Sequence, residues 1–263
     1  AGGPLQGVRV IEFAGIGPGP FAGMLLADMG ADVIVIERAS DVAAAARQPR
    51  PAMNRGKRSV ALDLKSEEGR TAAWALIESA DALIEGYRPG VMERLGFGPD
   101  AVAARQPRLV YGRITGWGQS GPLARAAGHD INYVALTGVL STSCRAGQAP
   151  VIPPTIVGDM GGGAMFLVFG LVCALFEAQK SGRGQQVDAA MVDGVVAMSS
   201  LVHQMRHSGF WSAKPERNLF ANSSPFYEVF ECADGGHITL GAIEPQFYAE
   251  MLQRLGLDGV DPA

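Results

Sequence analysis

Two short apolar runs near the N-terminus are the feature that most constrains the fold of this chain. Residues 8–13 (VRVIEF) and 32–37 (DVIVIE) are nearly continuous in apolar side chains, as buried parallel strands are. Between them, a break rich in glycine and proline over 15–20 precedes a helical pattern over 21–29. Strand, helix and strand in this order predict a βαβ unit. Further strands are expected at 82–85 and 109–114, so the expected fold class is α/β with a parallel sheet.

The composition allows a large buried interior. The chain has 263 residues, of which 48% are apolar and 18% charged, enough for one large domain and part of a second. Its net charge of −4 gives no support for a nucleic-acid partner, because basic residues are outnumbered. The three cysteines stand far apart without a CxxC spacing, so neither a disulfide framework nor a metal site is expected. No secretory signal is visible at residues 1–6, and we expect a cytoplasmic location, or a peroxisomal or mitochondrial one in a eukaryote.

The segment from Met160 to Phe176 carries no charge and could be mistaken for a membrane span. It is slightly short for a bilayer, begins with three glycines and is bounded by Asp159 and Glu177. We therefore interpret it as a helix buried in a large core or an oligomer interface, and we expect no membrane span.

Two loop-to-helix junctions carry the residues that could perform chemistry. His129 lies where a loop becomes a helix over 130–133, and Asp159 lies at the start of the apolar helix just described. Unpaired N–H groups and the helix dipole favour negative charge at such junctions. If the two side chains flanked one carbon atom, they could remove a hydrogen from one face and return one to the other, which is the chemistry of a racemase. Taken alone, Asp159 is more often a simple N-cap, and His129 is as often structural as functional.

The break at 15–20 also admits a rival interpretation. Together with Glu37 at the end of the second strand, it resembles a dinucleotide-binding fingerprint. Pro18 and Pro20 count against nicotinamide binding, because proline lacks the N–H that would face a phosphate. The spacing of the glycines, with Gly23 as the third, also departs from that motif.

Six basic residues lie between positions 47 and 65, in a stretch interrupted by prolines and a glycine. A solvated surface is the ordinary interpretation of such a charge run, and a docking surface for a ligand with several phosphates is the alternative. No Walker motif accompanies the run, so an ATPase is not expected. The six residues are Arg47, Arg50, Arg55, Lys57, Arg58 and Lys65.

Residues 185–208 are expected to form one long helix. His203 and His207 stand four residues apart in it, a spacing that could serve a metal. Because no third ligand is evident, we expect a plain helix and no bound metal.

The composition changes again near the C-terminus. Residues 227–232 and 237–240, with a turn between them, predict a β-hairpin, and Pro245 predicts the start of a helix. These elements indicate a second, smaller α+β domain. We therefore expect a large domain at 1–185, a helix and linker at 186–224, and the start of the small domain at 225–263.

Six stretches of the sequence carry a resemblance to a known family. They are VIEFAGIGPGP at 10–20, EGYRPGV at 85–91, TGWGQSGP at 115–122, GHDINY at 128–133, VDAAMVDG at 187–194 and GAIEPQFY at 241–248. Together they resemble the α-methylacyl-CoA racemases, a branch of the class III CoA-transferase superfamily, over nearly the whole chain. The stretches at 128–133 and 241–248 are specific to the racemase branch. Relatives that transfer CoA between acids share the general fold and an aspartate equivalent to Asp159.

The resemblance implies an isomerase of fatty acid metabolism that inverts the 2-methyl centre of 2-methylacyl-CoA thioesters. His129 would exchange the proton on one face of C2 and Asp159 on the other, through an enolate. Glu244, hydrogen-bonded to His129, would fix the tautomer and basicity of the imidazole. The residues alone predict only the first two roles, and Glu244 rests on the resemblance. No cofactor is expected, because CoA is part of the substrate.

The same resemblance implies how CoA binds and how chains assemble. Family members are interlocked homodimers, each subunit having a Rossmann-like large domain and a small domain, with the active site between subunits. This chain is expected to end inside the small domain. The CoA path would be lined by Arg38, Leu62, Asp63, Leu64, Lys65, Arg88 and Arg94, and the thioester end would be met by Gly128, Asp130, Ile131, Asn132 and Tyr133.

Two departures from the family's pattern bear on the substrate. Relatives commonly have asparagine four residues before the catalytic aspartate, where this chain has Thr155, and they have paired glycines where it has Ala221 to Ser224. We expect an altered acyl preference or weakened activity. The departures also leave open an inactive acyl-CoA-binding homologue. A CoA-transferase that uses Asp159 as a nucleophile is the alternative enzyme.

Overall fold

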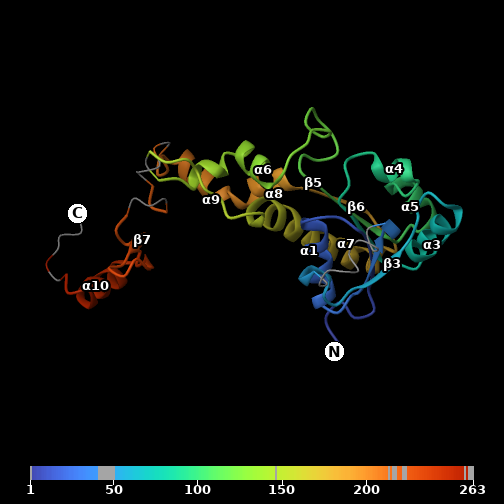
Figure 1. The fold of residues 1–263 in the computed structure, drawn as a ribbon, viewed down its shortest axis with the longest axis horizontal. Coiled ribbons are helices and arrows are strands. Elements are labelled where there is room, and N and C mark those ends of the chain that lie inside the picture. The colour runs from blue at the N-terminus through green and yellow to red at the C-terminus, as the bar shows by residue number, and fades with distance from the viewer. Residues whose placement is uncertain are drawn as a thin grey trace. The chain divides into compact units, whose positions relative to one another are not determined.

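The computed structural model describes residues 2–40, 51–145, 147–212, 214, 218–220, 224–257 and 259. The chain divides into two compact units, one formed by 1–137 with 153–198 and the other by 138–152 with 199–263. The large sheet and the helices that cover it, drawn from blue to gold in Figure 1, belong to the first unit.

A six-stranded, all-parallel sheet forms the centre of the first unit, in the order β3-β2-β1-β4-β5-β6. This confirms the expected α/β class with a parallel sheet. The strand order reverses between β1 and β4, and open α/β sheets bind ligands at the carboxyl ends of the strands beside such a reversal. The strands are β1 (Arg9–Phe13), β2 (Asp32–Glu37), β3 (Arg58–Ala61), β4 (Ala82–Glu85), β5 (Val110–Thr115) and β6 (Gln186–Ala190).

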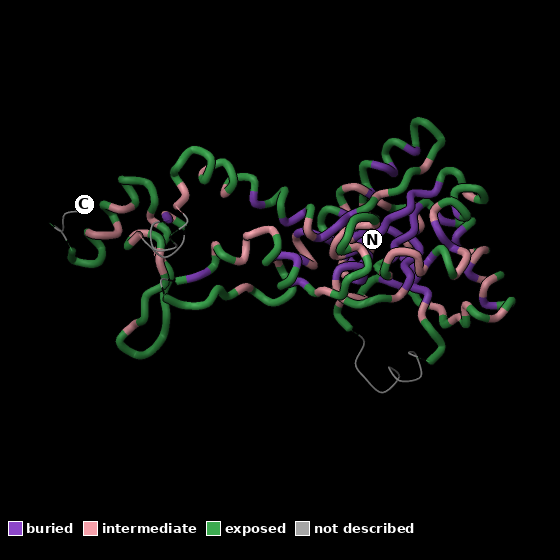
Figure 2. The backbone as a smooth tube through the Cα atoms, turned by 90° about the horizontal axis from the view of Figure 1, so that it is seen from above, coloured by how far each residue is buried: buried purple, intermediate pink, exposed green. Residues whose placement is uncertain are grey.

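Helices cover both faces of this sheet (Figure 1). On one face α1 (Pro18–Asp28) and α7 (Phe166–Ser181) pack on a buried cluster that includes Val10 and Ile84. On the other, α3 (Glu67–Glu78), α4 (Val91–Leu95) and α5 (Pro99–Arg105) pack on a cluster that includes Ile11 and Leu83. Figure 2 shows how the buried residues concentrate in these strands. Because neighbouring residues of a strand point to opposite faces, a sheet covered on both needs the unbroken apolar runs seen in the sequence.

Helix α1 begins at Pro18, three residues earlier than the predicted helix. Both Pro18 and Pro20 fall in its first turn, where the missing N–H of proline costs no helical hydrogen bond. The turn before it is made by Gly17, whose φ of 76° is a conformation that glycine adopts without strain.

The two edge strands were not predicted from the sequence. Residues 186–190 form β6, which pairs with β5, so the helix expected over 185–208 is wrong in its first part. Its remainder is split into α8 (Met191–Met198) and α9 (Ser200–His207). Strand β3 lies within the basic stretch, for which the sequence predicted no strand. An edge strand has a neighbour on one side only and carries polar side chains, so it lacks an apolar signal and depends on pairing.

The second unit contains the predicted hairpin. Strands β7 (Tyr227–Glu231) and β8 (His237–Gly241) pair antiparallel, and α10 (Pro245–Arg254) follows with proline in its first turn. Helix α9 and the short 3₁₀ helix η2 (Val139–Thr142) also lie in this unit. The hairpin and helix therefore confirm the predicted local structure, while the domain boundaries at 185 and 224 stay a prediction.

A buried ion pair lies between α1 and the sheet. The Lys57 ammonium donates to Glu12 Oε2 over 2.7 Å and to the carbonyl of Pro20 over 2.8 Å, and the Lys57 and Glu12 side chains are at most 1% exposed. A Cβ at Gly23 would lie 2.0 Å from Glu12 Oε2, so the helix can approach the pair only with glycine there. The third glycine of the rejected dinucleotide motif thus serves helix packing.

The basic stretch is therefore not one phosphate-docking surface. Lys57 is buried, while Arg55 pairs with Asp28 and Arg58 with Asp32 at the surface. Arg47 and Arg50 lie outside the described residues. Among the described members of the run, only Lys65 lies in the loop that follows β3.

The apolar segment of the first unit is helical from Ile156 to Ser181 and is long and apolar enough, by length and composition, to cross a membrane. One side of α7 packs on the sheet through Leu167 and Leu171. The helix is not buried all round in a single chain, because Phe169 and Phe176 on the other side are 72% and 59% exposed. A helix of a soluble core or an interface passes the same test, so the segment is weak evidence for a span.

Candidate functional site

The candidate site lies at the carboxyl ends of β1, β4 and β5, beside the reversal of strand order. The Tyr87 hydroxyl, in the loop after β4, donates to the carbonyl of Ala14, in the loop after β1, over 3.0 Å. In the loop after β5, the Gly118 N–H donates to Thr115 Oγ1 over 3.0 Å. These bonds order the loops at the edge of the sheet where ligands of open α/β proteins bind.

His129 immediately precedes α6 (Asp130–Leu136) and is held by its backbone. Its N–H donates to Asn132 Oδ1 over 3.0 Å, and its carbonyl accepts the Asn132 N–H over 2.8 Å. The Tyr133 hydroxyl donates to the carbonyl of Gly128, and its ring packs edge-on against Trp117 with centroids 4.7 Å apart. The backbone is thus fixed on both sides of His129, whose own side chain is exposed.

Asp159 lies in the first turn of η3 (Ile156–Met165), a π-helix that continues into α7. Glycine allows this helix to sit close to its neighbours: a Cβ at Gly194 of α8 would lie 1.9 Å from the carbonyl of Gly162. Glycine also clears the space in front of the carboxyl group, because a Cβ at Gly17 would lie 3.2 Å from Asp159 Oδ2. The sequence showed the glycine run but gave no sign of the π-helix, a geometry frequent at functional sites.

The electrostatics of the site centre on Asp159. Partial burial and the negative charge of Asp130 raise the pKa of Asp159 to about 6. The imidazole of His129 acts in the opposite direction. Burial likewise raises the pKa of Tyr133, with Asp159 and Asp130 adding to the increase and Arg88 opposing it. The charges of His129, Asp130 and Arg88 therefore act on Asp159 or Tyr133, the two titrating groups of this site. A carboxyl group with a pKa near neutrality can act as acid or base at physiological pH.

Thr155, at the start of η3, has a φ of 56° and is the one non-glycine residue with positive φ in the described part of the chain. Its carbonyl accepts the Met160 N–H over 3.2 Å, so this strained residue anchors the first π-type turn. Threonine is β-branched and disfavours this conformation, whereas asparagine tolerates it. The expected departure from the family's asparagine therefore affects the backbone conformation at this position.

We expect Thr155→Asn to stabilise the protein by about 1 kcal/mol, because it relieves left-handed strain. The midpoint of denaturant unfolding should rise with an unchanged slope. Thr71→Asn, on the exposed face of α3, is the matched control and should be neutral, since the two residues have similar helix propensities. Equal shifts in both variants would contradict a specific strain at Thr155.

Most of the residues expected to line the CoA path follow the carboxyl ends of β2, β3 and β4; β2 and β3 are neighbours in the sheet, and β1 lies between β2 and β4. Arg38 follows β2, and residues 62–65 follow β3, where the Leu62 N–H donates to the carbonyl of Glu37 over 2.9 Å and the Lys65 N–H to Asp63 Oδ1 over 2.9 Å. Arg88 follows β4 and Arg94 lies in α4. The basic side chains Arg38, Lys65, Arg88 and Arg94 are all exposed at this edge of the sheet.

Glu244, the third expected catalytic residue, lies in the other unit. It directly precedes α10, its side chain is exposed, and its carbonyl accepts the N–H groups of Phe247 and Tyr248. Its expected hydrogen bond to His129 stays a prediction. Of the second departure, only Ser224 lies within the described residues, and Ala221 to Ser223 lie outside them.

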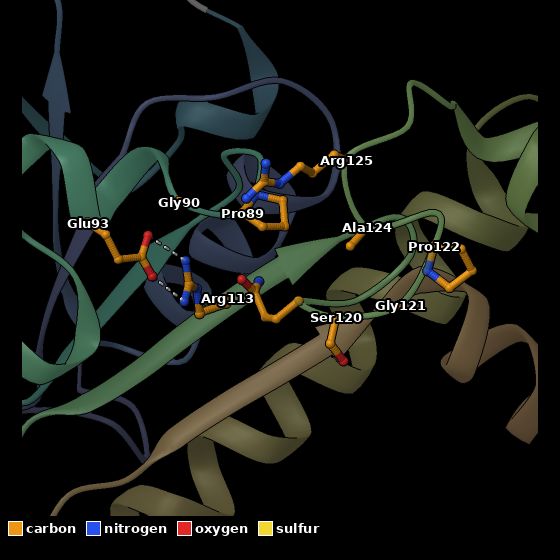
Figure 3. A pocket seen from close by; sticks show the side chains of 10 residues that line it. Pro89, Gly90, Glu93, Arg113, Ser120, Gly121, Pro122, Ala124 and Arg125 are labelled. Atoms are coloured by element: carbon orange, nitrogen blue, oxygen red, sulfur yellow. Dashed lines mark hydrogen bonds and ion pairs between the residues drawn. The ribbon is translucent and has the colours of Figure 1, made fainter.

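A hollow of about 460 Å³ lies beside α4, between the loops that follow β4 and β5 (Figure 3). Arg113 enters it from β5 and donates to Glu93 Oε1 over 2.8 Å and to the buried Glu85 over 2.7 Å. Burial raises the pKa of Glu85, which opposes its ionisation. Because the Arg113 guanidinium is already paired, it is not a free cation for a phosphate.

Comparison with known proteins identifies the family of this chain. A family model described as CoA-transferase family III matches residues 5–263. The chain is 45% identical over 254 residues to α-methylacyl-CoA racemase from Mus musculus, covering 97% of this chain and 65% of that protein. It is 42% identical over 253 residues to the racemase from Homo sapiens, covering 96% of this chain and 65% of that protein. The chain thus spans about two thirds of the length of these relatives.

Other similar proteins carry different names, and solved structures are among them. A succinate–glutarate CoA-transferase from Agrobacterium fabrum is 34% identical over 262 residues, covering 93% of this chain and 64% of that protein. The crystal structure of a CAIB/BAIF family protein from Brucella suis superposes with a TM-score of 0.83 at 28% identity, covering 98% of this chain and 71% of that one. The family match spans nearly the whole chain, and the fold agrees with it. The chain therefore belongs to CoA-transferase family III, and its sequence is similar to the α-methylacyl-CoA racemases within it.

Proposed function

We propose that this protein is an α-methylacyl-CoA racemase, which inverts the 2-methyl centre of 2-methylacyl-CoA thioesters by moving one proton off C2 and one proton on. The observation that carries the proposal is the electrostatic interaction of His129 with Asp159, a carboxyl group whose pKa is raised to about 6. The Asp159 carboxyl group can then hold or release a proton near neutral pH, and His129 is the second base that we assign. The similarity to two named racemases supports the same substrate class.

The reaction we propose needs two bases on opposite faces of C2. One removes the proton, and the C–H electron pair passes into an enolate on the thioester oxygen. The conjugate acid of the other then delivers its proton to the opposite face, which restores the C–H bond with inverted configuration. If the pKa of the C2 proton is about ten units above the pKa values of the protonated bases, the site must stabilise the enolate by about 14 kcal/mol. The N–H groups of Asp130 and Ile131, at the start of α6 next to His129, are the donors we assign to the enolate oxygen.

The substrate's phosphates fit the charged edge of the sheet. CoA carries a pyrophosphate and a 3′-phosphate, and we assign Arg38, Lys65, Arg88 and Arg94 to them because exposed basic side chains follow consecutive strand ends. The pantetheine arm would run along the loops after β1 and β4 toward His129. CoA is thereby a part of the substrate that anchors the reacting carbon.

A class III CoA-transferase is the second candidate, because named transferases are also among the relatives. In that reaction the Asp159 carboxylate would attack the thioester carbonyl and release the CoA thiolate. Hydroxylamine trapping of an Asp159 adduct in the presence of an acceptor acid would identify it. The raised pKa of Asp159 favours the racemase instead, because it increases the fraction of Asp159 that is protonated. A general acid must carry a proton, whereas a carboxylate nucleophile must be ionised.

Deuterium exchange tests the proposal. We expect the complete protein, incubated in deuterated water with one epimer of a 2-methylacyl-CoA, to give both epimers with deuterium at C2. The rate should follow a bell-shaped pH profile whose acid limb reflects Asp159 as part of the coupled pair. Below about pH 6 it should fall, because Asp159 is then protonated and cannot act as the base. Calorimetric binding of acyl-CoA without any exchange would reject the racemase and identify an inactive binding protein.

We also propose that two copies of the chain form a homodimer through the outer side of α7. Met165, Phe169 and Phe176 recur at helical spacing on this side and are 50%, 72% and 59% exposed. Exposed apolar side chains grouped in this way are typical of association surfaces. Sedimentation equilibrium should give the mass of two chains, and a monomer at micromolar concentration would contradict the proposal.

A further inference from the structure

Asp130 connects the helix that follows His129 with the helix that carries Asp159. Its Oδ2 accepts the N–H groups of Gly158 and Asp159, both over 2.7 Å. The residue is only 6% exposed, and its Oδ1 has no hydrogen-bond partner among the described residues. Hydrogen bonds from N–H groups to a carboxylate are strong and short, so this one side chain ties the backbone of Asp159 to the residue beside His129.

The neighbouring glycine shows that this contact needs a specific local fit. A Cβ at Gly158 would lie 2.8 Å from Asp130 Oδ2 and 3.1 Å from the Asp130 carbonyl. Any larger residue at this position would push the carboxylate away from the two N–H groups. Gly158 is therefore part of the connection between α6 and η3.

The charge of Asp130 also acts on Asp159. After burial, it is the larger of the two charges that set the pKa of Asp159, and the imidazole of His129 opposes it. Tyr133, on the same helix as Asp130, is the other titratable group that feels Asp159. The other charged groups on elements packed against η3 are not among the causes of the change in this pKa. They are Asp28 on α1, Arg113 on β5, Glu177 and Lys180 on α7, Asp188 on β6, and Asp193 on α8.

We propose that Asp130 is a positioning residue for the proton transfer, which fixes the backbone of Asp159 through two hydrogen bonds and whose negative charge opposes ionisation of the Asp159 carboxyl group. This inference rests on the proposed racemase function. It assigns Asp130 a role through its side chain, separate from any contact that its backbone N–H makes with the thioester. The two hydrogen bonds set the geometry, and the charge sets the protonation state.

Two variants separate these effects in the deuterium-exchange assay. Asp130→Asn keeps an oxygen acceptor for the two N–H groups but removes the charge, whereas Asp130→Ala removes both. We expect Asp130→Ala to lower kcat about 100-fold with KM changed less than about threefold, because a misplaced base slows the reaction without weakening CoA binding. Asp130→Asn should keep more activity at its optimum, and its acid limb should move to lower pH by about one unit. Loss of activity in Asp130→Ala through KM alone would overturn the proposal.

A titration that requires no catalysis completes the test. In protein labelled with ¹³C at aspartate carboxyl carbons, the signal missing from Asp159→Asn identifies Asp159. Its midpoint should lie near pH 6 in the unmodified protein and about one unit lower in Asp130→Asn. The matched control Asp193→Asn, an exposed first-turn aspartate of α8, should leave the midpoint unchanged.

The two readouts distinguish the failure of this inference from the failure of the proposed function. An unmodified protein that exchanges no proton rejects the racemase, and the titration still tests the link between Asp130 and Asp159. An active protein whose Asp159 midpoint is the same in Asp130→Asn overturns the inference. Because asparagine is nearly isosteric with aspartate, Asp130→Asn supplies the result even if Asp130→Ala fails to fold.

Discussion

Replacing His129 with alanine should lower the rate of inversion at C2 by about 10²–10⁴-fold, the range typical of a lost general acid or base. Inversion needs both bases, so it should fall in both directions. Exchange should survive for the one epimer whose C2 proton faces Asp159, because that group can remove and return a proton on its own face. Asp159→Asn should show the converse, with exchange kept only for the opposite epimer. Chiral separation followed by mass spectrometry of each epimer measures both quantities.

The pattern of surviving exchange is the sharpest part of this prediction. His203→Ala, which removes an exposed histidine from α9, is the matched control and should leave inversion and exchange unchanged. Equal loss of exchange from both epimers in His129→Ala would exclude a mechanism with one base on each face. A variant that inverts C2 at the full rate would exclude His129 from the reaction altogether.

Lys57→Met should destabilise the protein by about 3–5 kcal/mol, because it leaves the carboxyl group of Glu12 buried without its cation. Burial already raises the pKa of Glu12 despite the attraction of Lys57, and removing Lys57 should raise it further. A carboxyl group that holds its proton more tightly when folded favours folding at low pH. The variant should therefore be most stable below the unfolded pKa of glutamate and lose stability as the pH rises toward the folded value. Denaturant unfolding over a series of pH values measures both effects.

Two controls separate the buried pair from ordinary surface ion pairs. Arg55→Met breaks the pair with Asp28, in which Arg55 is 54% exposed, and should leave the stability nearly unchanged, because water screens an exposed ion pair. The double variant Glu12→Met with Lys57→Met should recover much of the loss, since an apolar pair of similar volume removes the uncompensated charge. A double variant as unstable as Lys57→Met alone would show that the bond from Lys57 to the carbonyl of Pro20 is the main contribution.

The predicted strands show which parts of the fold a sequence reveals. Strands β1, β2, β4 and β5 lie inside the sheet with helices on both faces, so their apolar runs were visible as sequence patterns. Strands β3 and β6 form the two edges, where exposed side chains are polar and local preference does not specify a strand. The sequence therefore predicted a helix, and not a strand, over residues 186–190. Pairing with a neighbour far along the chain decided their structure.

The candidate site divides in the same way. His129 and Asp159 were predicted because each residue type stands at a loop-to-helix junction, a local pattern that needs no tertiary information. The structure adds that Asp130 joins these junctions and that Gly17 lies against the Asp159 carboxyl group. Lys57 was not predicted correctly in this way. A basic run is ordinarily a solvated surface, whereas Lys57 is buried against Glu12. Partners 45 positions apart have no local signature.

The sequence by itself determined the α/β class, the interior strands, the C-terminal hairpin and the two residues proposed to move protons, because each depends on periodicity or on residue type over a few neighbouring positions. Only the tertiary structure decided the edge strands, the buried ion pair, the π-helix, and the burial and neighbouring charge that raise the pKa of Asp159. Burial and electrostatic interaction depend on distances between segments far apart in the chain. Those distances exist only after the sheet has formed and its loops have been brought together.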